Sequence, residues 1–466
     1  MAQDQNKAYT IDNAPLSWRH YFITGVASLG QLIGTGLATL VSVIIPLYQI
    51  NAHPELSSFL QGLVGAMDLI GIMVGSTILG KLSDRYGYLF FFRFCPALVC
   101  AAAIVNLLFP SLAVLLICLF IMGFGIGGEY SLDSNYISEL MPTKWVFMMV
   151  GAAKAASAFG NIIVAGVCFL IVKDWTDPDL WPRLMWIMIV ISGLMIILRI
   201  RFWESPKWLM EKGEAQKAEE DTRHFLGNDV NISASDIQAE LKLKQAEKAG
   251  AQPGFFKRNW KNVILTGVPW ACEGLGVYGI GVFLPILVMA LGLGDIHSDA
   301  TRLQHVASSV EITLWISCII LPGFILGLVL INRVEIARIQ WVGFLLSAVS
   351  LLVLLLAYRL HWAKGISIIA FMAFELFLNM GPHLITYVLP PKVYAVSDRG
   401  LGSGIAASLG KVGAVLGVFF IPVLLHSGGS SLVLIVSIVV MLVGGLVTFI
   451  FKPSAHTHEE GASKAL

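Results

Sequence analysis

One stretch in the first third of the chain has charged residues in an apolar segment, where burying a charge costs free energy. Glu129, Asp133 and Lys154 stand within residues 123–154, which begin inside an apolar run long enough to cross a bilayer. A charged side chain near the centre of a membrane helix costs at least about 2.5–3.5 kcal/mol. We therefore expect these side chains to face protein or a water-filled cavity and to take part in binding or proton transfer.

Polar residues form stripes at helical spacing on several apolar segments. Residues four apart share one face of a helix, and in a membrane a polar face turns to protein or water rather than to lipid. The stripes are Gln31, Thr35 and Thr39; Glu129, Asp133 and Tyr136; Lys154, Ser157 and Asn161; and Glu375, Asn379 and His383. Together they predict a central aqueous cavity.

Carboxylates in such a cavity are candidates for proton coupling. The candidates are Glu129, Asp133, Glu375 and Glu273. A carboxylate that exchanges a lysine partner for the solute would couple proton and solute movement. Glu129 is the first choice because its counterpart in the second half, Glu375, is expected to face the same cavity. The alternative is that Glu129, Asp133 and Lys154 form an ion-pair cluster that only packs the first half.

Polar and aromatic side chains of the same segments are candidates for binding the solute. They are Gln31, Tyr130, Lys154, Asn161, Trp270, Tyr278, Asn379 and His383. Two lysines within apolar runs, Lys154 and Lys411, favour an anionic solute, whereas the uncharged stripe on residues 31–39 leaves a sugar or polyol open. Packing around the helix-breaking pair Gly381-Pro382 is the alternative for the histidine and asparagine beside it.

Membrane-spanning helices must position these residues. The chain is 56% hydrophobic and 13% charged, against roughly 25% charged residues in soluble proteins. About 20 apolar residues in a helix cross the hydrocarbon core, and runs of that kind recur. The fold class expected is an all-α membrane protein with 12 spans in two six-helix halves, at 22–50, 58–80, 89–109, 112–138, 146–172, 183–203, 261–291, 307–331, 334–358, 365–388, 398–425 and 429–451.

The glycine run at residues 123–128 lies inside one of these spans. Its spacing resembles a dinucleotide-binding loop, but that motif requires a preceding strand and a soluble βαβ unit. We therefore interpret these glycines as a site of close helix packing.

A polar segment separates the two sets of spans. The expected domains are 1–203, a cytoplasmic linker at 204–260, and 261–466, with a short surface helix at 236–248 capped by Ser235. Lysine and arginine are concentrated in the loops that would be cytoplasmic if both termini lie inside. We therefore predict cytoplasmic termini in a cell inner membrane, with the first span retained because the polar N-terminus is not a signal peptide.

Unusual residues recur in the two halves at offsets of 242 to 257 positions. The pairs are Gln31 and Glu273, Asp68 and Glu311, Glu129 and Glu375, Asp133 and Asn379, and Lys154 and Lys411. Parallel repeats of six helices are typical of one large transporter fold. If the pattern holds, the acids at 68 and 311 meet where their helices touch and share a proton or a cation.

Several motifs resemble those of the major facilitator superfamily, in particular its sugar porters and metabolite–proton symporters. They are GKLSDRYG at 80–87, GFGIGGEY at 123–130, ESPKWL at 204–209 and the region 379–417. The resemblance implies alternating access and gating roles for Asp84, Arg85, Gly87, Glu139 and Arg399. The chain departs from the family pattern where Trp145-Val146 replaces Arg-Gly, so the cytoplasmic charge network is expected to differ.

The function expected is proton-coupled symport of a small polar metabolite, an organic acid or a sugar. A proton-independent facilitator or exchanger of a sugar or polyol is the alternative, and a non-transporting nutrient sensor is a remote one. The six cysteines lie in apolar runs without metal-ligand spacing, and no nucleophile–base pair is evident. We therefore expect no enzyme activity, cofactor or metal; the partners are the solute, a proton and the bilayer, with no nucleic acid, and the chain is expected to be a monomer.

Overall fold

The computed structural model describes residues 9–51, 57–226, 230–231, 254–293, 301–331, 333–394 and 399–452. Its N-terminal helices are α1 (Trp18–Ala27), α2 (Leu29–Asn51), α3 (Ser58–Tyr86), α4 (Tyr88–Leu108), α5 (Leu112–Leu140), α6 (Val146–Val172), a 3-10 turn η2 (Pro178–Leu184) and α7 (Met185–Arg199). We call this set the N-half. The predicted surface helix at 236–248 and its cap lie outside the described residues.

The C-terminal helices, which we call the C-half, are more often broken. They are α11 (Phe255–Gly274), the π-helix η3 (Leu275–Ile280), α12 (Leu284–Ala290), α13 (Arg302–Cys318), α14 (Ile320–Leu330), α15 (Ile336–Arg359), α16 (Lys364–Met380), α17 (Pro382–Val388), α18 (Pro390–Val393) and α19 (Arg399–Phe451). Between the halves lie α8 (Pro206–Glu211) and α9 (Ala215–Leu226). A two-residue parallel pairing joins β1 (Tyr9–Thr10), which precedes the 3-10 turn η1 (Ile11–Asn13), to β2 (Val230–Asn231).

The expectation of twelve spans is confirmed for the part of the chain that the structure describes. Eleven helical stretches there are long and apolar enough to cross a membrane, and the last of them, at 402–451, is fifty residues long. Gly429, with φ of 64°, interrupts it, so it contains two consecutive spans. Glycine reaches positive φ without the penalty that a Cβ brings, and the chain turns back at this point.

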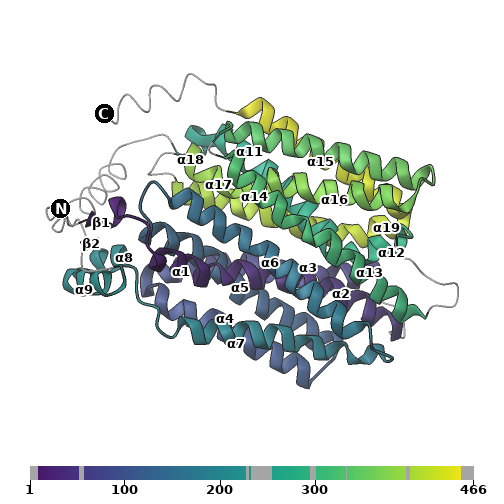
Figure 1. The fold of residues 1–466 in the computed structure, drawn as a ribbon, viewed down its shortest axis with the longest axis horizontal. Coiled ribbons are helices and arrows are strands. Elements are labelled where there is room, and N and C mark those ends of the chain that lie inside the picture. The colour runs from purple at the N-terminus through teal and green to yellow at the C-terminus, as the bar shows by residue number, and fades with distance from the viewer. Residues whose placement is uncertain are drawn as a thin grey trace, which may run out of the picture.

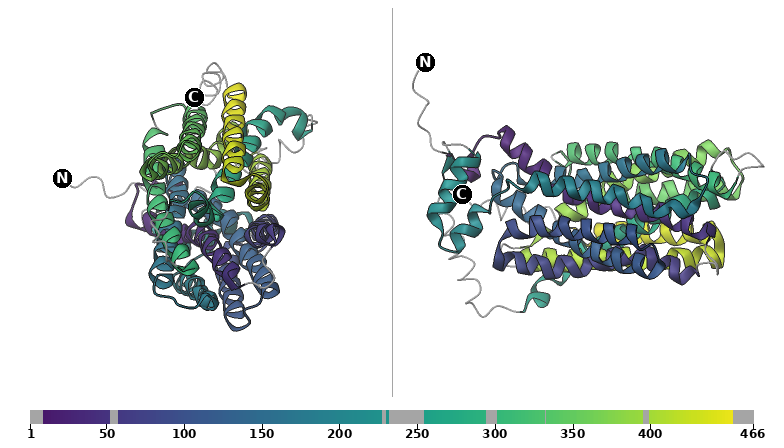
Figure 2. Two further views of the ribbon diagram at one scale, coloured as in Figure 1. Left: turned by 90° about the vertical axis from the view of Figure 1, so that its right-hand side faces the viewer. Right: turned by 90° about the horizontal axis from the view of Figure 1, so that it is seen from below.

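The helices run side by side as one elongated bundle (Figures 1 and 2). Figure 1 shows the N-half in purple and blue beneath the C-half in green and yellow, with α8, α9, β1 and β2 together at one end. We call this the linker end and the opposite one the far end. Helix α3 of the N-half packs on α19, and α6 packs on α13 and α14, so each half contributes helices to the seam between them.

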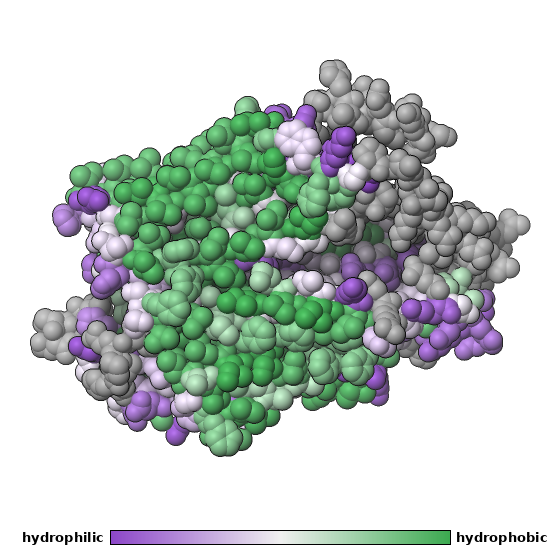
Figure 3. Space-filling view, turned by 180° about the vertical axis from the view of Figure 1, so that it is seen from behind, coloured by the Kyte–Doolittle hydropathy of each residue, from purple (hydrophilic) through white to green (hydrophobic). Residues whose placement is uncertain are grey.

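The seam is tight toward the far end. Phe59 of α3 and Phe419 of α19 meet edge to face with their ring centroids 5.3 Å apart, and a Cβ on Gly62 would lie 2.7 Å from the Phe419 carbonyl oxygen. Figure 3 shows a furrow between the two apolar halves that widens toward the linker end and has polar residues along it. This state therefore opens toward the linker end.

Close glycine contacts hold α3 against α5. A Cβ on Gly75 would collide with the backbone of Phe124, and a Cβ on Gly123 with the backbone of Asp68. Small residues let membrane helices approach until their backbones touch. The interpretation of the glycine run as a packing site is confirmed.

Candidate functional site

A polar cavity of about 50 Å³ lies between the two halves, beside the middle of α2. One water molecule needs roughly 10–15 Å³ of cavity volume, so the cavity has room for several waters. Its lining is Thr35, Ala38, Thr39, Ser42, Asn161, Val277, Tyr278, Gly281, Val282, Leu284, Thr313, Ser317, Ile320, Glu375, Asn379 and His383. Five of the candidate binding and proton-coupling residues are therefore brought together here, namely Asn161, Tyr278, Glu375, Asn379 and His383, along with Thr35 and Thr39 of the predicted polar stripe.

Hydroxyl and amide groups form the N-half wall of the cavity. The Thr39 hydroxyl donates to Asn161 Oδ1 at 2.8 Å, and the Thr35 hydroxyl donates to the Ser157 carbonyl at 2.7 Å. These bonds tie α2 to α6. Because Asn161 uses its amide oxygen in this contact, its amide nitrogen is left as a donor for a ligand.

A line of buried polar groups forms the C-half wall. Asn379 Nδ2 donates to Glu375 Oε2 at 3.1 Å, and Asn379 Oδ1 lies 2.8 Å from His383 Nδ1. At the other side of the imidazole, His383 Nε2 is 3.7 Å from Glu273 Oε1. The line crosses the break between α16 and α17, where Pro382 has no N–H to continue the helix.

The hydrogen bonds in this line fix the protonation of the histidine ring. An amide oxygen only accepts, so His383 Nδ1 carries a hydrogen. In the neutral ring, His383 Nε2 is then a hydrogen-bond acceptor, and it faces Glu273 Oε1, which is also an acceptor. Among the described residues, neither His383 Nε2 nor Glu273 Oε1 has a hydrogen-bond partner. One added proton would satisfy both atoms.

Two lysines and three tyrosines form a second group next to the cavity, which we call the two-lysine site. Lys411 Nζ lies 3.3 Å from the Tyr278 hydroxyl and 4.6 Å from the ring centroids of both Tyr278 and Tyr130. Lys154 Nζ is 5.5 Å from the Tyr130 ring and 5.8 Å from the Tyr387 ring. Ring faces attract ammonium groups at these distances, so the tyrosines hold both cations between the halves.

Acidic groups lie close to these lysines. Glu273, which is 1% exposed, interacts electrostatically with both Lys154 and Lys411. Asp68, which is fully buried on α3, interacts with Lys411 from the N-half. The expected contact between Asp68 and Glu311 is wrong, because α3 packs on α5 and α19 rather than on α13, and Glu311 is exposed.

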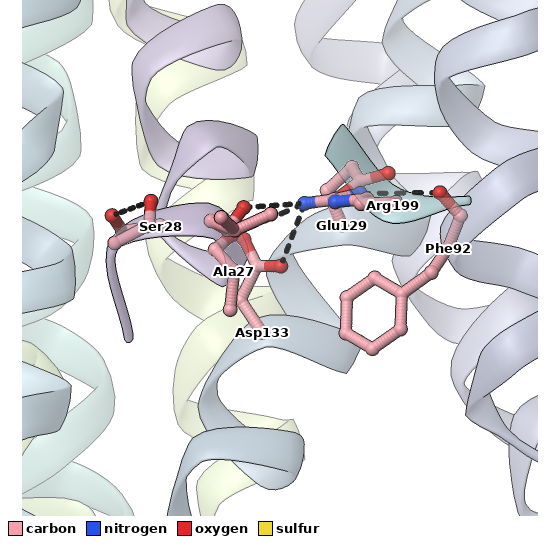
Figure 4. Close-up of polar contacts among 8 residues, drawn as sticks. Ala27, Ser28, Phe92, Glu129, Asp133 and Arg199 are labelled. Atoms are coloured by element: carbon pink, nitrogen blue, oxygen red, sulfur yellow. Dashed lines mark hydrogen bonds and ion pairs between the residues drawn. The ribbon is translucent and has the colours of Figure 1, made fainter. Parts of the chain in front are cut away.

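A separate ion cluster is sealed inside the N-half (Figure 4). Arg199 Nη1 lies 2.5 Å from Glu129 Oε2, and its Nη2 lies 3.6 Å from Asp133 Oδ1. The same guanidinium donates to the carbonyls of Phe92 at 3.3 Å and Ala27 at 3.2 Å. All three charged side chains are at most 1% exposed, so two carboxylates share one buried guanidinium.

This arrangement corrects two expectations about helix α5. Glu129 and Asp133 do not line the cavity, and their partner is Arg199 rather than Lys154. Successive residues of a helix point about 100° apart, so Glu129 turns toward α7 while Tyr130 turns toward the lysines. Gly30 of α2 leaves the space, since a Cβ there would lie 2.7 Å from the Glu129 Cβ.

Three other predicted binding residues lie outside the cavity lining. Gln31 is 1% exposed and its amide has no hydrogen-bond partner among the described residues. Trp270 packs against Gly410, and its ring centroid lies 6.3 Å from that of Tyr387. The Tyr130 hydroxyl lies 3.4 Å from the hydroxyl of Tyr278, which is part of the lining.

Two of the predicted gating residues, Gly87 and Glu139, lie at the linker end of the N-half. Helix α3 continues to Tyr86, and Gly87 alone, with φ of 90°, separates it from α4. Glu139 accepts from the Tyr88 hydroxyl at 2.9 Å and contacts the Ser205 hydroxyl. The side chains of Asp84, Arg85 and Arg399 lie outside the described residues.

A carboxylate that caps helix α4 lies beside Gly87 and Glu139, and we call this group of residues the linker-end corner. Glu204, in the ESPKWL motif, accepts from the backbone N–H groups of Tyr88 at 2.8 Å and Leu89 at 3.1 Å. These are orphan donors of the first turn of α4, where a negative charge is also favoured by the helix dipole. The corner therefore joins the start of α4, the last turn of α5 and the residues that precede α8 in one network.

Arg199 is the residue that the sequence reasoning missed. It ends a helix and stands two positions before Arg201, which is exposed. The available signal was its place within the predicted span 183–203, after a long apolar run. Sequence alone could not say which of the two arginines turns inward.

Comparisons with known proteins agree with this architecture. Residues 36–460 match the model of the family described as Sugar (and other) transporter. The chain belongs to this family. It is a multi-pass membrane transporter of the major facilitator type, resembling sugar porters, and not an enzyme.

Relatives and solved structures cover nearly the whole chain. The inner membrane metabolite transport protein YgcS of Escherichia coli is 24% identical over 446 residues, covering 95% of this chain and 93% of that protein. A putative inorganic phosphate transporter of rice (Oryza sativa subsp. japonica) is 25% identical, covering 88% and 85%. The partially occluded inward-open structure of the xylose transporter XylE from E. coli has a TM-score of 0.77 at 20% identity, covering 94% and 99%.

Proposed function

We propose that the protein is a proton-coupled symporter of a small polar metabolite that works by alternating access between its halves. A polar cavity at the seam supports this proposal, as does a structure that is tight toward the far end and open toward the linker end. Transporters of this architecture rock one bundle against the other around a site between them. Gly87 and Glu139, at the linker-end corner, are assigned to the gate on that side.

The observation that supports proton coupling best is the charge count around Arg199. Two carboxylates, Glu129 and Asp133, share one guanidinium out of contact with water. An unbalanced buried charge is costly, so the cluster is neutral when one carboxylate holds a proton. We assign proton binding to this pair, with Glu129 as the first choice.

Proteoliposomes that carry Glu129→Gln would test the assignment. We expect this variant to lose accumulation driven by a pH gradient but to retain exchange of labelled solute, measured on a panel of sugars and organic acids. Glu214→Gln is the matched control, because Glu214 is exposed on the surface. Full accumulation by Glu129→Gln would refute the assignment.

A proton-independent facilitator or exchanger of a sugar or polyol is the second candidate. The uncharged wall made by Thr35, Thr39 and Asn161 favours it, as does the separation of Glu129 and Asp133 from the cavity. It would show uptake down a gradient that no pH difference alters.

A further inference from the structure

We propose that the solute is a hydroxylated carboxylate and that its carboxylate binds in the two-lysine site in place of Glu273. This inference rests on the proposed transport function and names its substrate class. In the unliganded state, Glu273 serves as the counter-ion that the solute displaces. Glu273 then takes up one proton when the solute binds, in addition to the proton held by the Glu129–Asp133 pair.

The geometry provides a binding site for one carboxylate between the halves. Both ammonium nitrogens lie near the ring of Tyr130, at 4.6 and 5.5 Å from its centroid, so they are at most about 10 Å apart. Lys154 belongs to the N-half and Lys411 to the C-half. Hydroxyl groups of Tyr130 and Tyr278 lie between the halves at the same place. A carboxylate that contacts both lysines would therefore draw the halves together.

The charges of the site are balanced without solute. Lys154 and Lys411 both interact with Glu273, and Lys411 also interacts with Asp68 on α3, so two cations are matched by two carboxylates. An added anion would leave one uncompensated negative charge in a buried site, which is costly. A proton taken from water by Glu273 restores the balance, with one anion and one proton bound together.

The neighbouring side chain makes Glu273 the acceptor of that proton. His383 Nε2, 3.7 Å away, is the acceptor atom that lacks a hydrogen. A protonated Glu273 donates to it, so the carboxylic acid leaves the lysines and forms a hydrogen bond with α17. The charged and titratable groups around Glu273 are Lys154 on α6, Lys411 on α19, His383 on α17, Tyr130 on α5 and Tyr278 on η3. His383 is linked through Asn379 to Glu375.

The cavity explains why the anion should also bear hydroxyl groups. Tyr278 belongs to both the two-lysine site and the cavity lining. Beyond it the cavity presents hydroxyl and amide groups, among them Thr39, Asn161, Thr313 and Ser317. A short chain of hydroxyls attached to the carboxylate would fill this space, whereas inorganic phosphate would occupy only the end at the lysines.

Equilibrium binding to the purified full-length protein tests the substrate class without any transport. The probes are D-gluconate, D-glucose and D-glucitol, which share six carbons and differ in charge, together with inorganic phosphate. We expect gluconate to bind at least tenfold more tightly than the two neutral probes and than phosphate. Equal or tighter binding of a neutral probe, a preference for phosphate, or binding of none of the four would overturn the proposal.

Variants of the lysines localise the binding. Lys154→Gln and Lys411→Gln should each weaken gluconate binding at least tenfold, and Lys411→Arg, which keeps the charge, should restore most of it. Lys261→Gln is the matched control, because Lys261 is exposed on α11. Thermal unfolding of each variant shows whether it is folded. Unchanged affinity in both folded glutamine variants would contradict the assignment.

Proton uptake tests the role of Glu273. We expect gluconate binding in weak buffer to take up one proton per site in the unmodified protein, detected by an indicator dye, and none in Glu273→Gln. Glu311→Gln, an exposed glutamate on α13, is the control and should keep the uptake. Uptake that persists in Glu273→Gln would refute the displacement. Because these are equilibrium binding measurements, their outcome does not depend on whether Glu129→Gln keeps accumulation.

Discussion

At the scale of single residues, the molecule separates its buried charges into two groups with different surroundings. Arg199 holds Glu129 and Asp133 inside the N-half by direct contacts and by bonds to backbone carbonyls. Lys154 and Lys411 instead lie over tyrosine rings at the seam between the halves. The first group suits a carboxylate pair that holds one proton out of contact with water, and the second suits exchange of partners with an anion.

The guanidinium of Arg199 should be necessary for folding of the N-half. Removing one partner of a buried ion pair costs about 3–5 kcal/mol, because the other charge is left without compensation. We expect Arg199→Met to lower the thermal unfolding temperature and the yield of folded protein. Arg201→Met, two residues away and exposed, should have little effect.

A second substitution separates charge from packing. Combining Arg199→Met with Glu129→Gln and Asp133→Asn removes the unpaired charges, so stability should largely return. If the triple variant is no more stable than Arg199→Met, the cluster contributes by shape rather than by charge.

At the scale of elements, glycines and helix breaks decide where side chains meet. The crossing of α3 and α5 brings backbone against backbone at Gly75 and Gly123, which fixes the rotation of α5 and turns Glu129 inward. In the C-half, the break at Gly381-Pro382 separates α16 from α17. Across this break, Asn379 Oδ1 nevertheless lies 2.8 Å from His383 Nδ1.

A single added methyl group at the α3–α5 crossing should be harmful. Gly75→Ala places a Cβ against the Phe124 backbone, and overpacking of this kind costs about 1–3 kcal/mol or more. We expect a lower unfolding temperature in detergent. Gly193→Ala on α7 is the matched control, since nothing lies within 4 Å of its Cβ position; equal effects of the two substitutions would argue against a backbone contact.

At the scale of the whole molecule, transport requires the far end to open. Phe59 and Phe419 close it by a contact between the halves, with ring centroids 5.3 Å apart. In a background without the six natural cysteines, Phe59→Cys and Phe419→Cys joined by a short reducible cross-linker should lower transport at least tenfold. Reduction should restore it.

The control for this experiment is a pair within one half. Phe90 and Phe94 of α4 lie 5.7 Å apart and are exposed, so cysteines there can be cross-linked without joining the halves. Transport should survive that cross-link. Unimpaired transport by the Phe59–Phe419 cross-linked protein would mean that the far end does not open at this seam.

The sequence by itself determined the class of the fold. Hydrophobic runs of membrane length, the glycine run at 123–128 and the motifs around Gly87 and Glu204 gave the spans, the α3–α5 packing and the family. Helical spacing also placed Asn379 and His383 on one face, and the structure has them hydrogen-bonded. These features depend on local periodicity and on the length needed to cross a bilayer, and both can be read directly from the order of the residues. The cytoplasmic position of the termini and the domain limits at 203 and 260 stay predictions.

Only the tertiary structure decided which charges meet. Spacing along α5 showed that Glu129 and Asp133 share a face, but not that this face turns to Arg199 rather than to Lys154. The same limit applied to Asp68, which lies near Lys411 rather than Glu311. The rotation of each helix and the choice of its neighbours depend on contacts between residues far apart in the chain. Those contacts decide whether a charged side chain is buried in an ion cluster inside one half or lies at the seam between the halves.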